Sequence, residues 1–168
     1  IMKSISFVTA VLAASVAVAQ ELPQASPRGG VEQIVGLTKV EVDYSRPSAK
    51  GRVVFGDVVP YDKLWRTGAN LNTIIEIGGP VRFGDTDVKA GKYSLFTVPG
   101  KEMWVVHLNS NTELWGEDGF KPEENVASIK VKPTSGEFTE TRTCTFPKVL
   151  NGTSAPALRR EQTHGVIP

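Results

Sequence analysis

The sequence predicts an all-β fold, a single antiparallel β-sandwich, with jelly-roll-like or barrel-like strand arrangements as its variants. Three observations support this prediction. Apolar and polar residues alternate with a period of two along several short segments. Gly, Pro, Asn or Asp closes each segment, and no window longer than about ten residues shows a helical period. Short strands at regular spacing, separated by turn residues, are typical of sandwiches and barrels.

The clearest predicted strand is the segment 38–45, in which Val40, Val42 and Tyr44 share one face and polar residues occupy the other. The other predicted strands are residues 31–35, 72–77, 80–83, 93–98, 103–109, 127–132 and 138–146. Strand 93–98 is apolar on both faces, as expected for a strand that is covered on both sides. Turn residues predict hairpins at 84–87 and 98–102. The predicted core comprises Val40, Val42, Tyr44, Ile75, Ile77, Leu95 or Phe96, Val106 and Ile129.

The first residues have the organisation of a secretory signal. Lys3 precedes an apolar run over 5–18, and the small residues Ala17 and Ala19 stand just before Gln20. The run is shorter than the ~20 residues that span a bilayer. We therefore expect cleavage after Ala19, no membrane span in the mature chain, and a periplasmic or secreted protein. The predicted organisation is a signal peptide over 1–19, a leader over 20–30, a β-sandwich domain over 31–151 and a poorly ordered or divergent tail over 152–168.

Composition excludes several classes of protein. The 168 residues include 40% hydrophobic side chains, and 19 Lys plus Arg nearly balance 18 Asp plus Glu. A chain of this length can bury a substantial core, and its near-zero net charge gives no electrostatic reason to expect a nucleic-acid partner. Cys144 is the single cysteine, so no internal disulfide can form. Because it lies in a strand-like run, we expect a buried, unreactive thiol.

Familiar catalytic and metal-binding motifs are missing from the sequence. It contains no G-x-S-x-G, G-x-G-x-x-G, H-E-x-x-H or C-x-x-C. His107 and His164 have no other candidate ligand near them in the sequence, so we expect no metal site and no cofactor. Asp43 and Glu76 both fall within predicted strands and are candidates for the two facing carboxylates of a glycoside hydrolase. The alternative is that both are solvated residues on an outer sheet face.

The densest group of polar and aromatic residues lies in and before a long connection, residues 51–70, which we call the 51–70 loop. Arginine presents a planar fork for carboxylates, phosphates or hydroxyls, and aromatic rings offer stacking faces. These residue types predict a ligand-binding site without catalytic residues. Alternatively, the arginines fix the loop by donating to backbone carbonyls while Trp65 closes the end of the sandwich. The candidate ligand-binding residues are Arg46, Arg52, Tyr61, Trp65, Arg66 and Asn70.

Several short strings carry a resemblance to a known family. They are SPR at 26–28, VDYSRP at 42–47, KGR at 50–52, WRTGAN at 65–70, AGKYSLF at 90–96 and WG at 115–116. Together they resemble the bacterial domain-of-unknown-function family numbered 2911, most densely over residues 26–133. The resemblance implies a small exported β-rich domain of Gram-negative bacteria with no established biochemical activity. Members of that family close with further alternating strands that contain a Trp, whereas residues 152–168 show neither feature. Divergence or a change of reading frame near 142–147 would each explain the difference.

Three functions are compatible with these observations. The first is a noncatalytic periplasmic binding or interaction module that uses the 51–70 loop, with a glycan or another envelope component as its partner. The second is a carbohydrate-active hydrolase that uses Asp43 and Glu76, and the third is a structural envelope protein without a small-molecule ligand. The missing catalytic motifs favour the first and the third. A cleft that holds Asp43, Glu76 and Trp65 together would favour the hydrolase.

Overall fold

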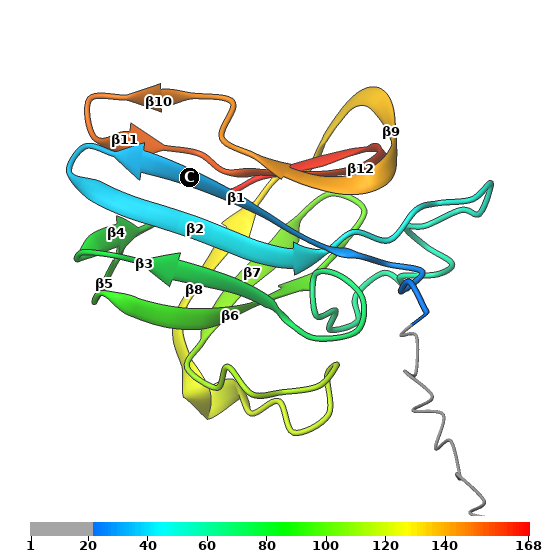
Figure 1. The fold of residues 1–168 in the computed structure, drawn as a ribbon, viewed down its shortest axis with the longest axis horizontal. Coiled ribbons are helices and arrows are strands. Elements are labelled where there is room, and N and C mark those ends of the chain that lie inside the picture. Colours follow the sequence, from blue (N-terminus) through cyan, green and yellow to red (C-terminus); the bar gives the residue numbers. More distant parts are fainter. Residues whose placement is uncertain (1–21) are drawn as a thin grey trace, which may run out of the picture.

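The computed structural model describes residues 22–168, which form antiparallel β-sheets with one short 3-10 turn, Pro122–Glu124 (Figure 1). The predicted all-β, antiparallel class is confirmed. No helix in this part of the chain is long and apolar enough to cross a membrane. The predicted signal peptide, residues 1–19, lies outside the described residues. The strands are β1 Arg28–Val35, β2 Thr38–Ser45, β3 Thr73–Ile77, β4 Val81–Phe83, β5 Thr86–Val88, β6 Gly91–Val98, β7 Trp104–Asn109, β8 Asn125–Val131, β9 Thr134–Thr145, β10 Val149–Leu150, β11 Thr153–Ser154 and β12 Ala157–Val166.

Six strands form the main sheet, in the order β1-β2-β3-β6-β7-β8. Strand β2 has the predicted bounds and alternates as predicted, with Val40, Val42 and Tyr44 buried. Strand β1 begins at Arg28, so residues 28–30 belong to the sheet and not to a leader. Both predicted hairpins are present: β4 pairs with β5 around Gly84, which has a positive φ of 60°, and β6 pairs with β7.

The predicted core is confirmed. All of its members are buried except Ile129, which is partly buried and packs against the rest. Strand β6 is covered on both faces, as its sequence predicts: both Leu95 and its neighbour Phe96 are buried. The Phe120 ring, from the connection between β7 and β8, packs edge-on against Phe96 with 4.9 Å between centroids. That connection therefore covers the side of the sheet opposite the main core.

Strands β9 and β12 form a separate antiparallel ribbon, which Figure 1 shows lying across the main sheet. The backbone N–H of Cys144 in β9 donates to the Tyr44 hydroxyl of β2 at 2.9 Å. At Gly165 in β12, an added Cβ would lie 2.9 Å from the Trp104 ring of β7. The ribbon thus contacts the main sheet at both ends, and its Leu158 joins the same hydrophobic cluster.

The prediction of a poorly ordered tail over 152–168 is wrong. Thr153–Ser154 forms β11, and Ala157–Val166 forms β12, which pairs along β9. The alternation is hidden because the register shifts twice, on either side of Glu161, whose φ is +51°. At each shift β12 advances by two residues while β9 advances by four, so the unpaired residues belong to β9. In β12 the buried positions change phase across Glu161, from Leu158 and Arg160 to Gly165. The strand also buries Arg160, which a pattern of apolar residues cannot reveal.

Candidate ligand-binding site

The string WRTGAN, residues 65–70, anchors the 51–70 loop to the main sheet. Trp65 and Thr97 of β6 exchange backbone hydrogen bonds of 2.8 and 2.9 Å. The indole Nε1–H of Trp65 donates to the Gly68 carbonyl at 3.0 Å, and its ring packs edge-on against Phe55 with 5.8 Å between centroids. Trp65 therefore fixes one end of the 51–70 loop. This is the structural role that the sequence analysis gave as the alternative to ligand binding.

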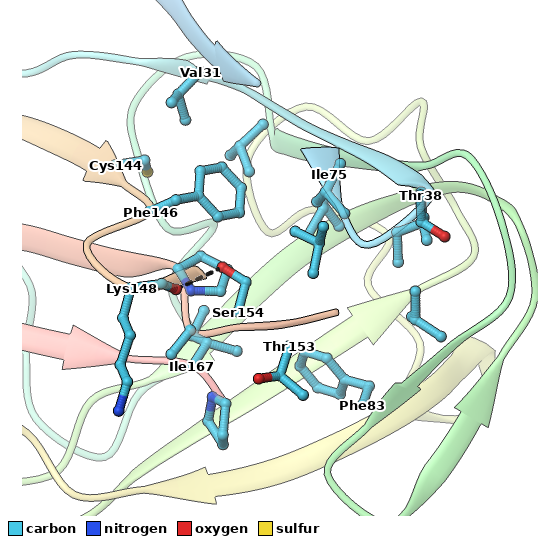
Figure 2. Close-up of a pocket in the computed structure, with 18 of the residues that line it drawn as sticks. Val31, Thr38, Ile75, Phe83, Cys144, Phe146, Lys148, Thr153, Ser154 and Ile167 are labelled. Atoms are coloured by element: carbon cyan, nitrogen blue, oxygen red, sulfur yellow. Dashed lines mark hydrogen bonds between the residues drawn. The ribbon is translucent and has the colours of Figure 1, made fainter. Parts of the chain in front are cut away.

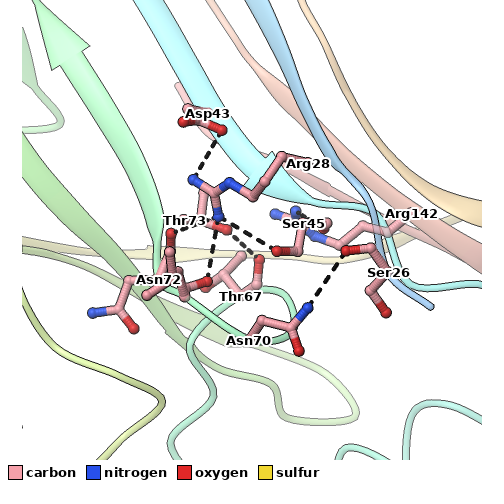
Figure 3. A network of polar contacts seen from close by, with 10 residues as sticks. Ser26, Arg28, Asp43, Ser45, Thr67, Asn70, Asn72, Thr73 and Arg142 are labelled. Carbon is pink, nitrogen blue, oxygen red and sulfur yellow. Dashed lines mark hydrogen bonds and ion pairs between the residues drawn. The ribbon is translucent and has the colours of Figure 1, made fainter. Parts of the chain in front are cut away.

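A strained turn follows Trp65. Thr67 is fully buried with φ +53°, a region that β-branched residues rarely occupy. Its conformation is held by three polar contacts. Its hydroxyl lies 3.3 Å from the Trp65 carbonyl oxygen, to which it donates, and 3.2 Å from Thr97 Oγ1. Its carbonyl accepts from Thr73 Oγ1 at 2.7 Å (Figure 3). Strain of this kind persists where surrounding contacts determine the backbone, and it often accompanies binding sites.

A cavity of about 500 Å³, which we call the loop cavity, lies beside this turn. Three of the six predicted residues line it: Arg52, Trp65 and Arg66. The volume falls within the range of small-molecule sites. The other lining residues are Ser26, Pro47, Val58, Val59, Pro60, Lys63, Leu64, Gly68, Ala69, Glu117 and Arg160.

Arg66 and Glu117 form the polar wall of the loop cavity. Arg66 Nη1 lies 2.8 Å from Glu117 Oε2, and the backbone N–H of Arg66 donates to Oε1 of the same carboxylate at 2.9 Å. The guanidinium also lies 5.9 Å from the ring centroid of Trp115, a largely exposed side chain. Arg66 Nε is buried and has no partner among residues 22–168. Arg66 and Glu117 therefore hold each other at this wall of the loop cavity.

Arg52 combines the two roles that the sequence left open. Its Nε and Nη2 donate to the carbonyls of Ala49 and Ser48, each at 3.0 Å, which fixes the start of the loop. The same side chain lines the loop cavity. Arg52 is therefore both a structural residue and a cavity wall.

The remaining three predicted residues do not line the loop cavity. Arg46 Nε donates to the Arg142 carbonyl at 3.3 Å, so it fixes the segment directly after β2 to β9. Tyr61 packs against Gly56 and lies beneath the Lys101 ammonium, 5.7 Å from the ring centroid. Asn70 Nδ2 donates to the carbonyl of Ser26 at 3.4 Å (Figure 3). These three are positioned as scaffold, which is the alternative interpretation of the cluster.

Two buried arginines of the ribbon were missed by sequence reasoning. Arg142 of β9, 1% exposed, lies over the rings of Tyr44 and Trp65, at 4.7 and 5.9 Å from their centroids. Its Nη1 donates to the Ser45 carbonyl at 3.4 Å (Figure 3). Burial lowers the Arg142 pKa from its ordinary value. Arg160 of β12 lines the loop cavity directly. A signal for Arg160 was present in the sequence, because Arg159 and Arg160 are adjacent charges, but both lie in the segment predicted to be poorly ordered.

Asp43 and Glu76 lie on the solvent-exposed face of the main sheet. Because Glu41 pairs with Glu76 and alternates with Asp43, the two candidate carboxylates project from the same side. Each forms an ion pair: Asp43 Oδ1 lies 2.8 Å from Arg28 Nη2, and Glu76 Oε2 lies 3.1 Å from Lys92 Nζ. Neither lines the loop cavity with Trp65. This placement matches the solvated-residue alternative.

Cys144 is buried, as predicted, and burial raises the pKa of its thiol, which keeps it protonated and unreactive. His107 Nδ1 lies 2.7 Å from Ser128 Oγ, and partial burial lowers its pKa. Within residues 22–168, no group of three or more His, Cys, Asp or Glu side chains is arranged to hold a metal ion.

A second cavity, of about 650 Å³, lies between the main sheet and the segment after β9 (Figure 2). We call it the apolar cavity, because Val42, Ile75 and Phe146 are representative of its lining. The charged side chains in the lining are Arg82 and Lys148, both cationic. The sequence analysis missed this cavity because its outer wall includes residues 152–156, which were assigned to the tail.

The fold and the cavities define a small antiparallel β-domain with one basic and one apolar cavity. The chain belongs to the family described as Protein of unknown function (DUF2911), whose model matches residues 26–167. The resemblance noted in the sequence is thereby confirmed, and it extends 34 residues beyond residue 133 (167 − 133). The C-terminal segment that seemed to depart from the family lies inside the match. Comparisons with curated proteins and with solved structures found no match.

Proposed function

We propose that this chain is a noncatalytic periplasmic or secreted binding module, a β-sandwich that holds a ligand in the loop cavity. The observation that carries the proposal is the convergence of Arg52, Trp65 and Arg66 on one cavity. The sandwich arrangement is supported by the hydrophobic cluster shared between the main sheet and the β9–β12 ribbon. A glycan or another envelope component is the proposed partner. The carbohydrate hydrolase remains the less supported alternative, because Asp43 and Glu76 are both ion-paired on an open sheet face.

The Arg66 guanidinium and the Trp115 ring beside it support binding. Arg66 lines the loop cavity, and the exposed Trp115 ring, which is not part of the lining, lies 5.9 Å from the same guanidinium. A planar donor beside an aromatic face suits a sugar ring that carries hydroxyl or anionic groups. Trp65, by contrast, is almost fully buried, so it shapes the cavity without offering a free face for stacking.

Substituting Arg66→Lys is expected to remove ligand binding while changing stability by less than about 1 kcal/mol, because the Arg66–Glu117 pair is partly exposed and Lys keeps the charge. Lysine lacks the planar fork of hydrogen-bond donors that arginine presents to a ligand. The measurement is a thermal-shift screen of the protein against neutral oligosaccharides, small carboxylates and divalent metal ions. A ligand of the native state raises the melting temperature by mass action.

Arg82→Lys is the matched control for this screen, since Arg82 lines the other cavity. It should retain every ligand-induced shift that Arg66→Lys loses. A destabilisation of about 1–3 kcal/mol by Arg66→Lys, with all ligand effects unchanged, would show that Arg66 only holds the loop.

The apolar cavity supports a second candidate function, binding of an amphiphile with an acyl chain and an anionic head group. Its lining is mainly aliphatic and aromatic, and its charged members, Arg82 and Lys148, are cations. Adding palmitate to the same screen tests this candidate. A shift that is lost in Arg82→Lys and kept in Arg66→Lys would assign binding to the apolar cavity.

Export is the proposed route of the chain, with cleavage between Ala19 and Gln20. The charged start, the apolar run and the small residues before Gln20 support it. Mass spectrometry of the periplasmic or secreted fraction should find an N-terminus at Gln20. Recovery of uncleaved chain in the cytoplasm would contradict both the cleavage and the compartment.

A further inference from the structure

Arg160 is a buried cation without a counter-ion in the described part of the chain. It is 3% exposed, its Nε is buried and unpartnered, and no ion pair among residues 22–168 involves it. Burial, together with the nearby Arg142 and Arg52, lowers its pKa to about 10, against the opposing effects of Glu161 and Glu140. With a pKa near 10, the guanidinium remains charged at neutral pH. An unpaired buried charge is costly unless something compensates it.

The loop cavity carries an excess of positive charge. Its lining includes the cations Arg52, Lys63, Arg66 and Arg160. Glu117 is the one carboxylate among the described lining residues, and Arg66 occupies both of its oxygens. Neither Arg52 nor Arg160 forms an ion pair with a carboxylate of residues 22–168. Because Arg52 uses Nε and Nη2 on the carbonyls of Ala49 and Ser48, the cavity offers the Arg160 guanidinium and the remaining nitrogen of Arg52 to an incoming anion.

We propose that the loop cavity binds a phosphate group, with Arg160 as a principal binding residue. This inference rests on the proposed binding function and names the chemistry of its ligand. A guanidinium fork pairs well with the oxygens of phosphate, and charge-assisted hydrogen bonds of this kind are the strongest available. Two available guanidiniums match a doubly charged phosphate better than a singly charged carboxylate.

A purely structural role for Arg160 accounts less well for its surroundings. Structural arginines bridge backbone carbonyls or carboxylates, as Arg52 does with Ala49 and Ser48. Arg142 and Arg159 also have a buried Nε without a partner, but of these three arginines Arg160 alone lines the loop cavity. An apolar side chain of similar length would fill the same space without the desolvation cost of a charge, and such replacements are often neutral or stabilising. The retained charge therefore points to a ligand.

The test is isothermal titration calorimetry of the protein with inorganic phosphate, glucose 6-phosphate and glucose. The variant is Arg160→Met, and the matched control is Arg159→Met, whose side chain does not line the loop cavity. We expect Arg160→Met to weaken phosphate binding about 10- to 100-fold, the loss of one or two hydrogen bonds to a charged group. Its melting temperature without phosphate should stay the same or rise, whereas loss of a structural arginine would lower it.

Each outcome supports or overturns the inference. Tighter binding of glucose 6-phosphate than of inorganic phosphate indicates a phosphate ester, and equal affinities indicate free phosphate; both support it. Absence of phosphate binding, or equal affinity in Arg160→Met, overturns it. If a neutral sugar binds and Arg66→Lys abolishes that binding while phosphate has no effect, the proposed function stands and the phosphate inference fails. Should Arg160→Met fail to fold, Arg160→Lys tests the same fork with the charge retained.

Discussion

Cutting the chain after Asn151 is expected to abolish the native fold. The cut removes β12, the pairing partner of β9, and with it the buried side chains of Leu158 and Ile167. Each side chain of this kind contributes roughly 1.5–3 kcal/mol when it is fully buried, and a domain is stable by only about 5–15 kcal/mol in total. The cut also uncovers Trp104, against which Gly165 packs, and leaves β9 with an unpaired edge.

Circular dichroism during heating measures this effect. The shortened protein should show no cooperative unfolding transition, while the full chain should show one.

Two leucine substitutions test the contribution of β12 without removing it. Leu158→Ala should lower the free energy of unfolding by about 2–5 kcal/mol. Leu37→Ala, at a fully exposed turn position, should change it by less than about 0.5 kcal/mol. An unchanged melting temperature after the cut would mean that β12 contributes nothing to the fold.

Replacing Trp65 by alanine is expected to cost about 3–5 kcal/mol, the typical loss for a large buried aromatic side chain. Trp65 packs on Phe55, lies beneath the Arg142 guanidinium, and donates from its indole to the Gly68 carbonyl. Without the indole, the Gly68 carbonyl, which follows the strained residue Thr67, loses its hydrogen-bond donor. The loop cavity should lose its shape together with the stability.

Trp115→Ala is the matched control, because that ring is 63% exposed. Its contact with the Arg66 guanidinium is worth less than about 1 kcal/mol at an exposed position. Chemical denaturation followed by circular dichroism gives both free energies of unfolding. An equal decrease in the free energy of unfolding for the two variants would show that Trp65 does not fix the 51–70 loop.

Strands with regular alternation could be predicted from the sequence. The predicted bounds of Thr38–Ser45 match the observed strand, because its inward residues, such as Val42, are apolar and its outward residues, such as Asp43, are polar. The segment 93–98, observed as β6 Gly91–Val98, was predicted to be covered on both sides because both of its faces carry apolar residues, and Phe120 provides the second cover. In both cases the local pattern and the burial agree.

Strand β12 could not be predicted from alternation. The register with β9 shifts on either side of Glu161, the buried positions of β12 change phase there, and a buried charge, Arg160, stands where an apolar residue is expected. The pairing with β9 joins residues that are far apart in the sequence, so no local signal reports it. The composition of residues 152–168 therefore led to the prediction of a poorly ordered tail where the structure has an ordered strand.

The candidate site was predictable only where the loop itself supplies it. Arg52, Trp65 and Arg66 are close in sequence and meet in one cavity, whereas Arg46 turns to β9. Arg160 arrives from the other end of the chain through the β9–β12 pairing. A local cluster can indicate a site, but the cation that completes it depends on tertiary structure.

The central claim is that the loop cavity binds a phosphate group, and nuclear magnetic resonance tests it most directly. In a titration of the ¹⁵N-labelled protein with inorganic phosphate, the account predicts saturable shifts of the backbone amides of Arg66, Gly68 and Arg160, which line the loop cavity. The amides of Val42 and Ile75, at the apolar cavity, should not move. Absence of shifts, or shifts confined to the apolar cavity, would contradict the account.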